Sequence, residues 1–176
     1  MSGKSKTKSE GTAPSGPRFR SVLMICAANT ARSVMAEHVL RRELKVRGGD
    51  GRVRVVSAGI APYARDGALV SLDTRLVLRT EGIHLDEEST STDLKRHPEL
   101  LAAADLVLAM TRQQAIELHA KFPVPAESAV FTFKEFAGHA GDIDDPYEKG
   151  DAVFHACLDE IMRLAPRVAD RILGDD

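Results

Sequence analysis

Tryptophan is absent from this chain of 176 residues, and tyrosine and cysteine each occur only twice. Proteins that bind single-stranded nucleic acids depend on aromatic stacking, so the scarcity of aromatic residues disfavours that class. Two cysteines permit one disulfide at most, which excludes a disulfide-rich scaffold and favours a reducing compartment. No apolar run approaches the roughly 20 residues that cross a bilayer, and the polar N-terminus lacks a secretion signal. We therefore expect a cytoplasmic protein that does not associate with membranes.

Positive charge is concentrated in the first twenty residues, which carry five basic side chains and one acidic one. The whole chain has a formal charge of -2, so the rest of the chain is acidic. We expect residues 1–18 to form a disordered basic tail and residues 19–176 to form one domain. Such a tail can contact nucleic acid or an acidic partner, but a solvated tail is the simpler interpretation. We expect the domain itself to bind no nucleic acid and to be a monomer or a weak dimer.

Short apolar runs alternate with amphipathic segments from residue 19 onward. The runs predict strands near 21–25, 53–57, 105–110 and 129–133. Apolar residues at helical spacing predict helices over 35–44, 72–82, from 112 onward, and over 154–172. Pro166 lies inside the last pattern and should kink or divide that helix. The alternation predicts a single α/β domain with a four-stranded parallel sheet and helices on both faces, as in flavodoxin-like folds.

The loop after the first predicted strand carries the most informative motif, Cys26-Ala-Ala-Asn-Thr-Ala-Arg32-Ser33. In parallel α/β folds, ligands bind at the carboxyl ends of the strands, where this loop lies. Consecutive backbone N–H groups followed by a helix N-terminus form a cradle for an anion, and their positive field favours a thiolate at Cys26. Arg32 offers a planar fork for two phosphate oxygens and for charge that develops in a transition state.

Two polar residues complete the predicted loop. Ser33 can donate a hydrogen bond to the Cys26 sulfur while capping the following helix, and Asn29 suits a left-handed turn and can brace the loop with its amide. The candidate phosphate-binding loop thus comprises Ala27, Ala28, Asn29, Thr30, Ala31 and Ser33, between Cys26 and the first helix. These parts form a nucleophile for phosphoryl transfer that needs no histidine base. The alternative is a buried structural cysteine, because a Cys and an Arg at this spacing also occur by chance.

The sequence resembles the low-molecular-weight protein-tyrosine phosphatases. The resemblance runs from about residue 20 to residue 173, and it rests on several motifs together: Cys26-x5-Arg32-Ser33, Met35-Ala-Glu37, Ser57-Ala-Gly59, Ala104–Met110 and Asp144-Asp-Pro-Tyr147. It implies the fold of that family and a covalent phosphocysteine intermediate on Cys26, with Arg32 holding the phosphate. It also implies a phosphorylated protein as substrate and no cofactor.

The resemblance assigns the general acid to Asp145, in the Asp-Pro sequence. A carboxylic acid there would protonate the leaving group and then, once ionised, activate water. The alternative is an acidic turn, since Asp142 and Asp144 lie close by and Pro146 follows. Tyr63 and Tyr147 are both candidates for the walls of a shallow pocket. Tyr147 is the better candidate because it could stack on a flat substrate group, whereas we expect Tyr63 to lie on a loop.

The substrate side chain is either phosphotyrosine or phosphoarginine, and the sequence favours phosphoarginine. Thr30 stands where tyrosine-specific enzymes tend to carry a bulkier aliphatic residue, and Met110-Thr111 and residues 130–135 also resemble the arginine-specific branch. The Thr30 hydroxyl can pair with a guanidinium N–H, whereas an aliphatic side chain prefers the face of a phenyl ring.

Departures from the family pattern leave two other functions open. Ala28 replaces a typical glycine, which would strain the loop if that position requires positive φ. Ala31 replaces a frequent second cysteine, so oxidised Cys26 would have no adjacent resolving thiol. The alternatives are an arsenate reductase on the same fold and a non-catalytic phosphate-binding regulator. The first needs further cysteines, whereas Cys157 lies on an apolar helix stripe and is expected in the core. The six histidines show no metal-ligand spacing, so we expect no metal.

Overall fold

The computed structural model describes residues 16–175. Most of the predicted basic tail, residues 1–18, lies outside the described residues. Four strands form one fully parallel sheet in the order β2–β1–β3–β4. Their bounds are β1 Ser21–Cys26, β2 Arg54–Gly59, β3 Leu106–Ala109 and β4 Ala129–Thr132. The prediction of a single α/β domain with a four-stranded parallel sheet is confirmed.

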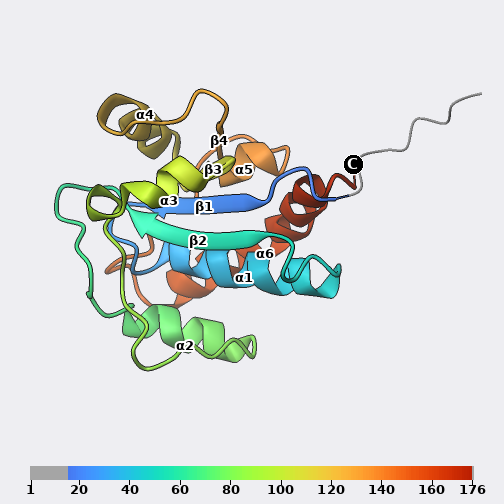
Figure 1. The fold of residues 1–176 in the computed structure, drawn as a ribbon. Helices are drawn as coiled ribbons and strands as arrows, with labels where there is room; N and C mark the ends of the chain where they lie inside the picture. The colour runs from blue at the N-terminus through green and yellow to red at the C-terminus, as the bar shows by residue number, and fades with distance from the viewer. Residues whose placement is uncertain (1–15, 176) are drawn as a thin grey trace, which may run out of the picture.

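Helices cover both faces of this sheet (Figure 1). The main ones are α1 Arg32–Val46, α2 Leu72–Thr80, α4 Arg112–Lys121 and α6 Asp151–Leu173. Shorter turns of helix are η1 Leu94–Arg96, α3 Pro98–Ala103 and α5 Phe133–Phe136. Because side chains alternate along a strand, Val22 and Met24 of β1 pack with α1 and α6, while Leu23 and Ile25 pack with α3 and α4 on the opposite face. Two apolar clusters therefore hold the layers together.

Helix α6 runs without interruption across Pro166, so the proline does not divide it. A proline ring removes one backbone donor and crowds the preceding turn. The helix nevertheless buries an apolar stripe that includes Ile161, Val168 and Ile172, and this burial on both sides of the proline outweighs the local cost.

The central strand β1 lies at the point where the strand order reverses direction. The chain passes from β1 to β2 on one side, and β3 and β4 lie on the other side. Loops that leave neighbouring strands in opposite directions at such a point open a crevice at the carboxyl end of the sheet. The segment from Cys26 to Arg32 leaves β1 at this crevice, as the sequence predicted.

Candidate active site

The loop between β1 and α1 has the conformation that its residue types favour. Asn29 has φ 60°, in the left-handed region that asparagine tolerates. Its side chain braces the loop: Nδ2 donates to Ser33 Oγ at 2.9 Å and to Ser57 Oγ at 2.8 Å, and Oδ1 accepts from the Thr92 N–H at 2.9 Å. Among the described non-glycine residues only Asn29 and Glu148 have positive φ, so Ala28 carries none of the expected strain.

Gly59 at the end of β2 allows this loop to pass close to the sheet. A Cβ atom at this position would lie 2.7 Å from the Ala27 carbonyl oxygen and 2.8 Å from the Ala28 carbonyl carbon. Both neighbours are backbone atoms, which cannot rotate out of the way. The Ser57-Ala-Gly59 motif therefore has a steric reason: glycine leaves room for the loop.

Two donors lie beside the Cys26 sulfur. The Ser33 hydroxyl is 2.9 Å from Sγ, and the Asn29 backbone N–H donates to Sγ at 3.3 Å. Because Asn29 Nδ2 donates to Ser33 Oγ, the hydroxyl proton is free to point at the sulfur. The backbone N–H groups of Ala28, Thr30 and Ala31 donate to no other group within the described chain. This arrangement can stabilise a sulfur anion and still offer N–H groups to a bound oxyanion.

Ser33 does not cap the first helix, in contrast to the prediction. Helix α1 begins at Arg32, its N-cap is Ala31, and no side chain caps it. Ser33 therefore lies within the first turn, where its hydroxyl is directed back to the loop and the sulfur. The first-turn N–H groups remain uncapped by any side chain, as an anion site requires.

Arg32 lies almost fully buried at the start of α1. Its Nη1 donates to the Ile143 carbonyl oxygen at 3.0 Å, and its Nη2 lies 3.6 Å from Asp145 Oδ2. The guanidinium is thus fixed by the segment that precedes the Asp-Pro sequence. A fixed guanidinium can hold two oxygens of a phosphate without losing side-chain freedom on binding.

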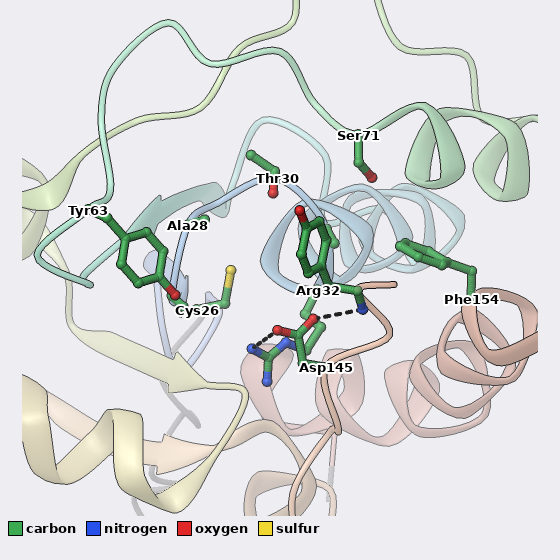
Figure 2. A pocket seen from close by; sticks show the side chains of 11 residues that line it. Cys26, Ala28, Thr30, Arg32, Tyr63, Ser71, Asp145 and Phe154 are labelled. Carbon is green, nitrogen blue, oxygen red and sulfur yellow. Dashed lines mark hydrogen bonds and ion pairs between the residues drawn. The ribbon is translucent and has the colours of Figure 1, made fainter. Parts of the chain in front are cut away.

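Asp145 is distinguished by position from the two other aspartates of its segment. Its carboxylate lines the same pocket as Cys26, faces Arg32, and accepts a hydrogen bond from the Tyr147 N–H at 3.1 Å (Figure 2). Asp142 instead accepts from the Arg112 N–H at 2.9 Å, outside this pocket. The side chain is half exposed, so it can exchange protons with water.

The predicted loop residues surround one pocket of about 370 Å³. All of the predicted site residues line it except Asn29 and Ser33, which are buried behind the loop. Tyr63 also lines it (Figure 2), so of the two positions considered for this tyrosine the structure shows the pocket wall and not the expected place on a loop away from the site. Ser71 and Phe154 were not predicted as site residues. Phe154 was expected only in a helix stripe, and Ser71 shows only the pattern of a helix cap, so neither carried a local signal of ligand contact.

Cys157 packs into the core beneath the Asp-Pro segment, as its place on the α6 stripe predicted. It is free and buried, and its sulfur lies 4.0 Å from the Asp144 carbonyl oxygen. Burial raises the pKa of the Cys157 thiol to about 12 despite the nearby Arg32 charge. This cysteine therefore remains a thiol at neutral pH.

No group of three or more His, Cys, Asp or Glu side chains within residues 16–175 is arranged to hold a metal ion. No helix in that part of the chain is long and apolar enough to span a membrane.

Comparison with known proteins identifies the family. The family model for low molecular weight phosphotyrosine protein phosphatase matches residues 21–175. The chain belongs to this family. This phosphatase is similar to a protein-arginine-phosphatase of Geobacillus stearothermophilus, with 36% identity over 152 residues, covering 86% of this chain and 95% of the relative.

Solved structures show the same fold with both kinds of substrate in their names. A low-molecular-weight protein tyrosine phosphatase from T. tengcongensis superposes with a TM-score of 0.76 and 32% identity, covering 86% of this chain and 99% of that one. A cysteine-to-serine variant of YwlE arginine phosphatase, with its active-site serine phosphorylated, superposes with a TM-score of 0.78 and 29% identity. The match covers 88% of this chain and 97% of that one. As a member of this family, the phosphatase described here is a cysteine-dependent hydrolase.

Proposed function

We propose that this chain dephosphorylates protein side chains through a phosphocysteine on Cys26, with Arg32 binding the phosphate and Asp145 acting as general acid. The observation that carries the proposal is that the sulfur, the guanidinium and the carboxylate line one pocket. Asn29 and Ser33 support the sulfur from behind. The phosphorylated protein is the only partner that the proposed reaction requires.

In the first step the Cys26 thiolate attacks phosphorus, and an S–P bond forms while the bond from phosphorus to the substrate oxygen or nitrogen breaks. The leaving atom takes the proton of Asp145, which avoids expelling a strong base. Arg32 and the loop N–H groups bind the equatorial phosphate oxygens, where charge develops. In the second step the ionised Asp145 takes a proton from water, whose oxygen attacks phosphorus and breaks the S–P bond. Inorganic phosphate leaves, and the thiolate is restored.

For the substrate we propose phosphoarginine. Thr30 lines the pocket, and its hydroxyl points into it (Figure 2). There it can accept a hydrogen bond from a guanidinium, which a phenyl ring cannot donate. The rings of Tyr63 and Tyr147 also line the pocket and offer flat faces to a planar group. The similarity to named arginine phosphatases supports this choice.

The covalent mechanism is tested by Cys26→Ser and Asp145→Ala, with Cys157→Ser as the matched control. Wild type and the control should release phosphate from an aryl phosphate, and Cys26→Ser should not. Asp145→Ala should slow turnover by about 10²–10⁴-fold for poor leaving groups, and much less for good ones. Turnover by Cys26→Ser would exclude a phosphocysteine.

Substrate choice is tested by kcat/KM on matched phosphoarginine and phosphotyrosine peptides. Wild type should prefer phosphoarginine, and Thr30→Ile should shift the ratio at least tenfold toward phosphotyrosine, the size of one lost polar contact. A wild type that prefers phosphotyrosine would contradict the substrate proposal while leaving the covalent mechanism intact.

The two alternative functions make different demands on the chain. An arsenate reductase relay needs a second reactive thiol, and Cys157 is buried with its pKa raised to about 12. A binding module needs neither a thiolate nor an acid. The binding-module hypothesis would be favoured if the wild type showed no turnover and bound phosphate as tightly as Cys26→Ser does.

A further inference from the structure

A buried threonine on α2 holds the phosphate-binding loop from outside the pocket. Thr74 is fully buried, and its Oγ1 donates to the Thr30 carbonyl oxygen at 3.1 Å. The same carbonyl oxygen accepts from the Ser71 backbone N–H, also at 3.1 Å. Both lone pairs of this oxygen are therefore bound by the first turn of α2 and its cap.

The hydroxyl groups of Ser71 and Thr74 form a relay with a defined direction. The Thr74 N–H donates to Ser71 Oγ at 3.1 Å, and the two hydroxyl oxygens lie 2.6 Å apart. Because Thr74 gives its only hydroxyl proton to the Thr30 carbonyl, the short contact is a donation from Ser71 to Thr74. Every donor and acceptor in the relay is satisfied, so the loop and the start of α2 form one hydrogen-bonded unit.

Helix α2 is itself a rigid support. The Arg75 guanidinium donates to the carbonyl oxygens of Asp86 and Ser89, each at 2.9 Å. Val77 and Leu78 of the same helix are buried in the core with α1 and α6. A carbonyl tied to this helix is consequently held in a fixed position relative to the sheet.

Holding the Thr30 carbonyl also sets the direction of the next donor. The described chain has no cis peptide bond, and in a planar trans peptide the C=O and the following N–H point in opposite directions. With the Thr30 oxygen bound to α2, the Ala31 N–H is directed away from that helix. Ala31 lines the pocket, and its N–H has no partner within the described chain.

We propose that Thr74 is a positioning residue for phosphate binding: it fixes the Thr30–Ala31 peptide so that the Ala31 N–H and the Thr30 side chain meet the ligand. Thr74 acts through the loop and touches no reacting atom. The proposal rests on the proposed function only for its consequences in turnover, because anion binding can be measured without it.

The test compares Thr74→Val with Thr74→Ser and with Thr80→Val as the matched control. Valine keeps the shape of threonine but cannot donate to Thr30, whereas serine keeps the hydroxyl. Thr80 lies on the same helix and donates to a carbonyl of its own helix, Val77, at 2.6 Å. Vanadate affinity, measured by calorimetry, should fall about tenfold in Thr74→Val, the effect of misdirecting one charge-assisted hydrogen bond. Thr74→Ser and Thr80→Val should bind vanadate as wild type does.

Ser71→Ala provides a second, milder variant: it leaves the Thr74 hydroxyl in place but removes the Ser71 hydroxyl, which contacts Thr74 Oγ1 and accepts from the Thr74 N–H at the edge of the pocket. It should weaken vanadate binding by about two- to threefold. In steady-state assays Thr74→Val should raise KM more than it lowers kcat, because the nucleophile and acid are untouched. Wild-type vanadate affinity in Thr74→Val, or equal losses in Thr74→Val and Thr80→Val, would overturn the proposal. A wild type that binds vanadate but hydrolyses no phosphopeptide would instead count against the proposed function.

Discussion

The two cysteines differ in environment although both lie near Arg32. Cys26 lines the pocket and is contacted by hydrogen-bond donors, whereas Cys157 is buried in the core and burial raises its pKa to about 12. Because the pKa of the Cys157 thiol is raised, the folded state keeps this proton to a higher pH than the unfolded chain does. Its contribution to stability is therefore complete below about pH 9 and is lost as the pH rises through about 12.

We expect iodoacetamide at pH 8 to alkylate Cys26 and to leave Cys157 unmodified, because the thiolate is the reactive form. Inorganic phosphate should slow the labelling of Cys26 by occupying the cradle. Peptide mass mapping of the native protein measures both sites, and denatured protein serves as the control in which both react. Labelling of Cys157 in native protein at a rate similar to Cys26 would contradict its burial.

Gly59→Ala should disrupt the loop as well as lower stability. Its Cβ would collide with the backbone of Ala27 and Ala28, so we expect a loss of about 2 kcal/mol or more in the free energy of unfolding. Vanadate affinity should fall with it. Gly48→Ala is the matched control: its φ of 72° disfavours alanine, but a Cβ there meets no atom within 4 Å. That variant should lose only about 1 kcal/mol and bind vanadate normally. Equal vanadate affinity in both variants would refute the steric argument.

Residue types alone predicted the left-handed Asn29 and the sulfur contact of Ser33, because both depend on local chemistry. The role of Ser33 as a cap was wrong, since the N-cap of helix α1 is Ala31, two residues earlier, and the Ser33 hydroxyl is directed to the sulfur. Thr74 left no such signal. Its partner Thr30 is 44 residues away, and only the folded chain brings the two together.

At the scale of elements, helix α1 carries two neighbouring ionisable groups with opposite responses to acid. Burial, reinforced by the positive charge of Arg41, lowers the pKa of His38 to about 4. Burial raises the pKa of Glu37, although Arg41 and Ser57 partly oppose this. His38 Nε2 lies 3.4 Å from Glu37 Oε2. With His38 neutral at pH 7, this contact is not an ion pair.

These shifts predict how stability responds to acid. Because the pKa of His38 is lowered in the folded state, the unfolded chain binds the proton first as the pH falls. The free energy of unfolding therefore decreases between about pH 6.5 and 4. Glu37 acts in the opposite sense, since its protonation is easier in the folded state. We expect His38→Gln to remove on the order of 2 kcal/mol of the loss between pH 6.5 and 4. Urea unfolding at several pH values measures it, and an unchanged slope would contradict the burial of His38.

Strand and helix patterns predicted the main elements because each has a clear apolar period. The short helices η1, α3 and α5 span only three to six residues, too few for a period to show. Helix α6 shows a second limit of local sequence patterns. The local preference of Pro166 predicted a kink or division, but long-range packing keeps the helix undivided.

At the scale of the molecule, the pocket walls come from segments that are distant in sequence. Cys26 ends β1 and Arg32 begins α1, Tyr63 follows β2, and Asp145 precedes α6. The motifs predicted the loop and the acid, but the assembly of the walls depends on the packing of α2 and α6 against α1.

Removal of residues 1–15 should leave kcat/KM for an aryl phosphate within about twofold of the full chain, because every pocket-lining residue lies at or beyond Cys26. The start of the described fold is tied independently: the Phe19 N–H donates to the Ile172 carbonyl oxygen at 3.1 Å, and the Phe19 and Phe136 rings meet edge to face. The melting temperature should likewise stay the same within about 2 °C, a shift worth at most about 1 kcal/mol. A large loss of activity would show that residues 1–15 contribute to the site.

The bond between Phe19 and Ile172 joins the amino end of β1 to the last turn of α6, and the pocket opens where β1 ends. Figure 1 shows the end of α6 at one end of the sheet and the arrowheads of the strands at the other. A solid support or a fused carrier attached beyond Leu173 is therefore located at the end of the sheet opposite the pocket. Attachment at this end immobilises the phosphatase in a uniform orientation in which the pocket opens to the solution and is accessible to substrates as bulky as intact proteins.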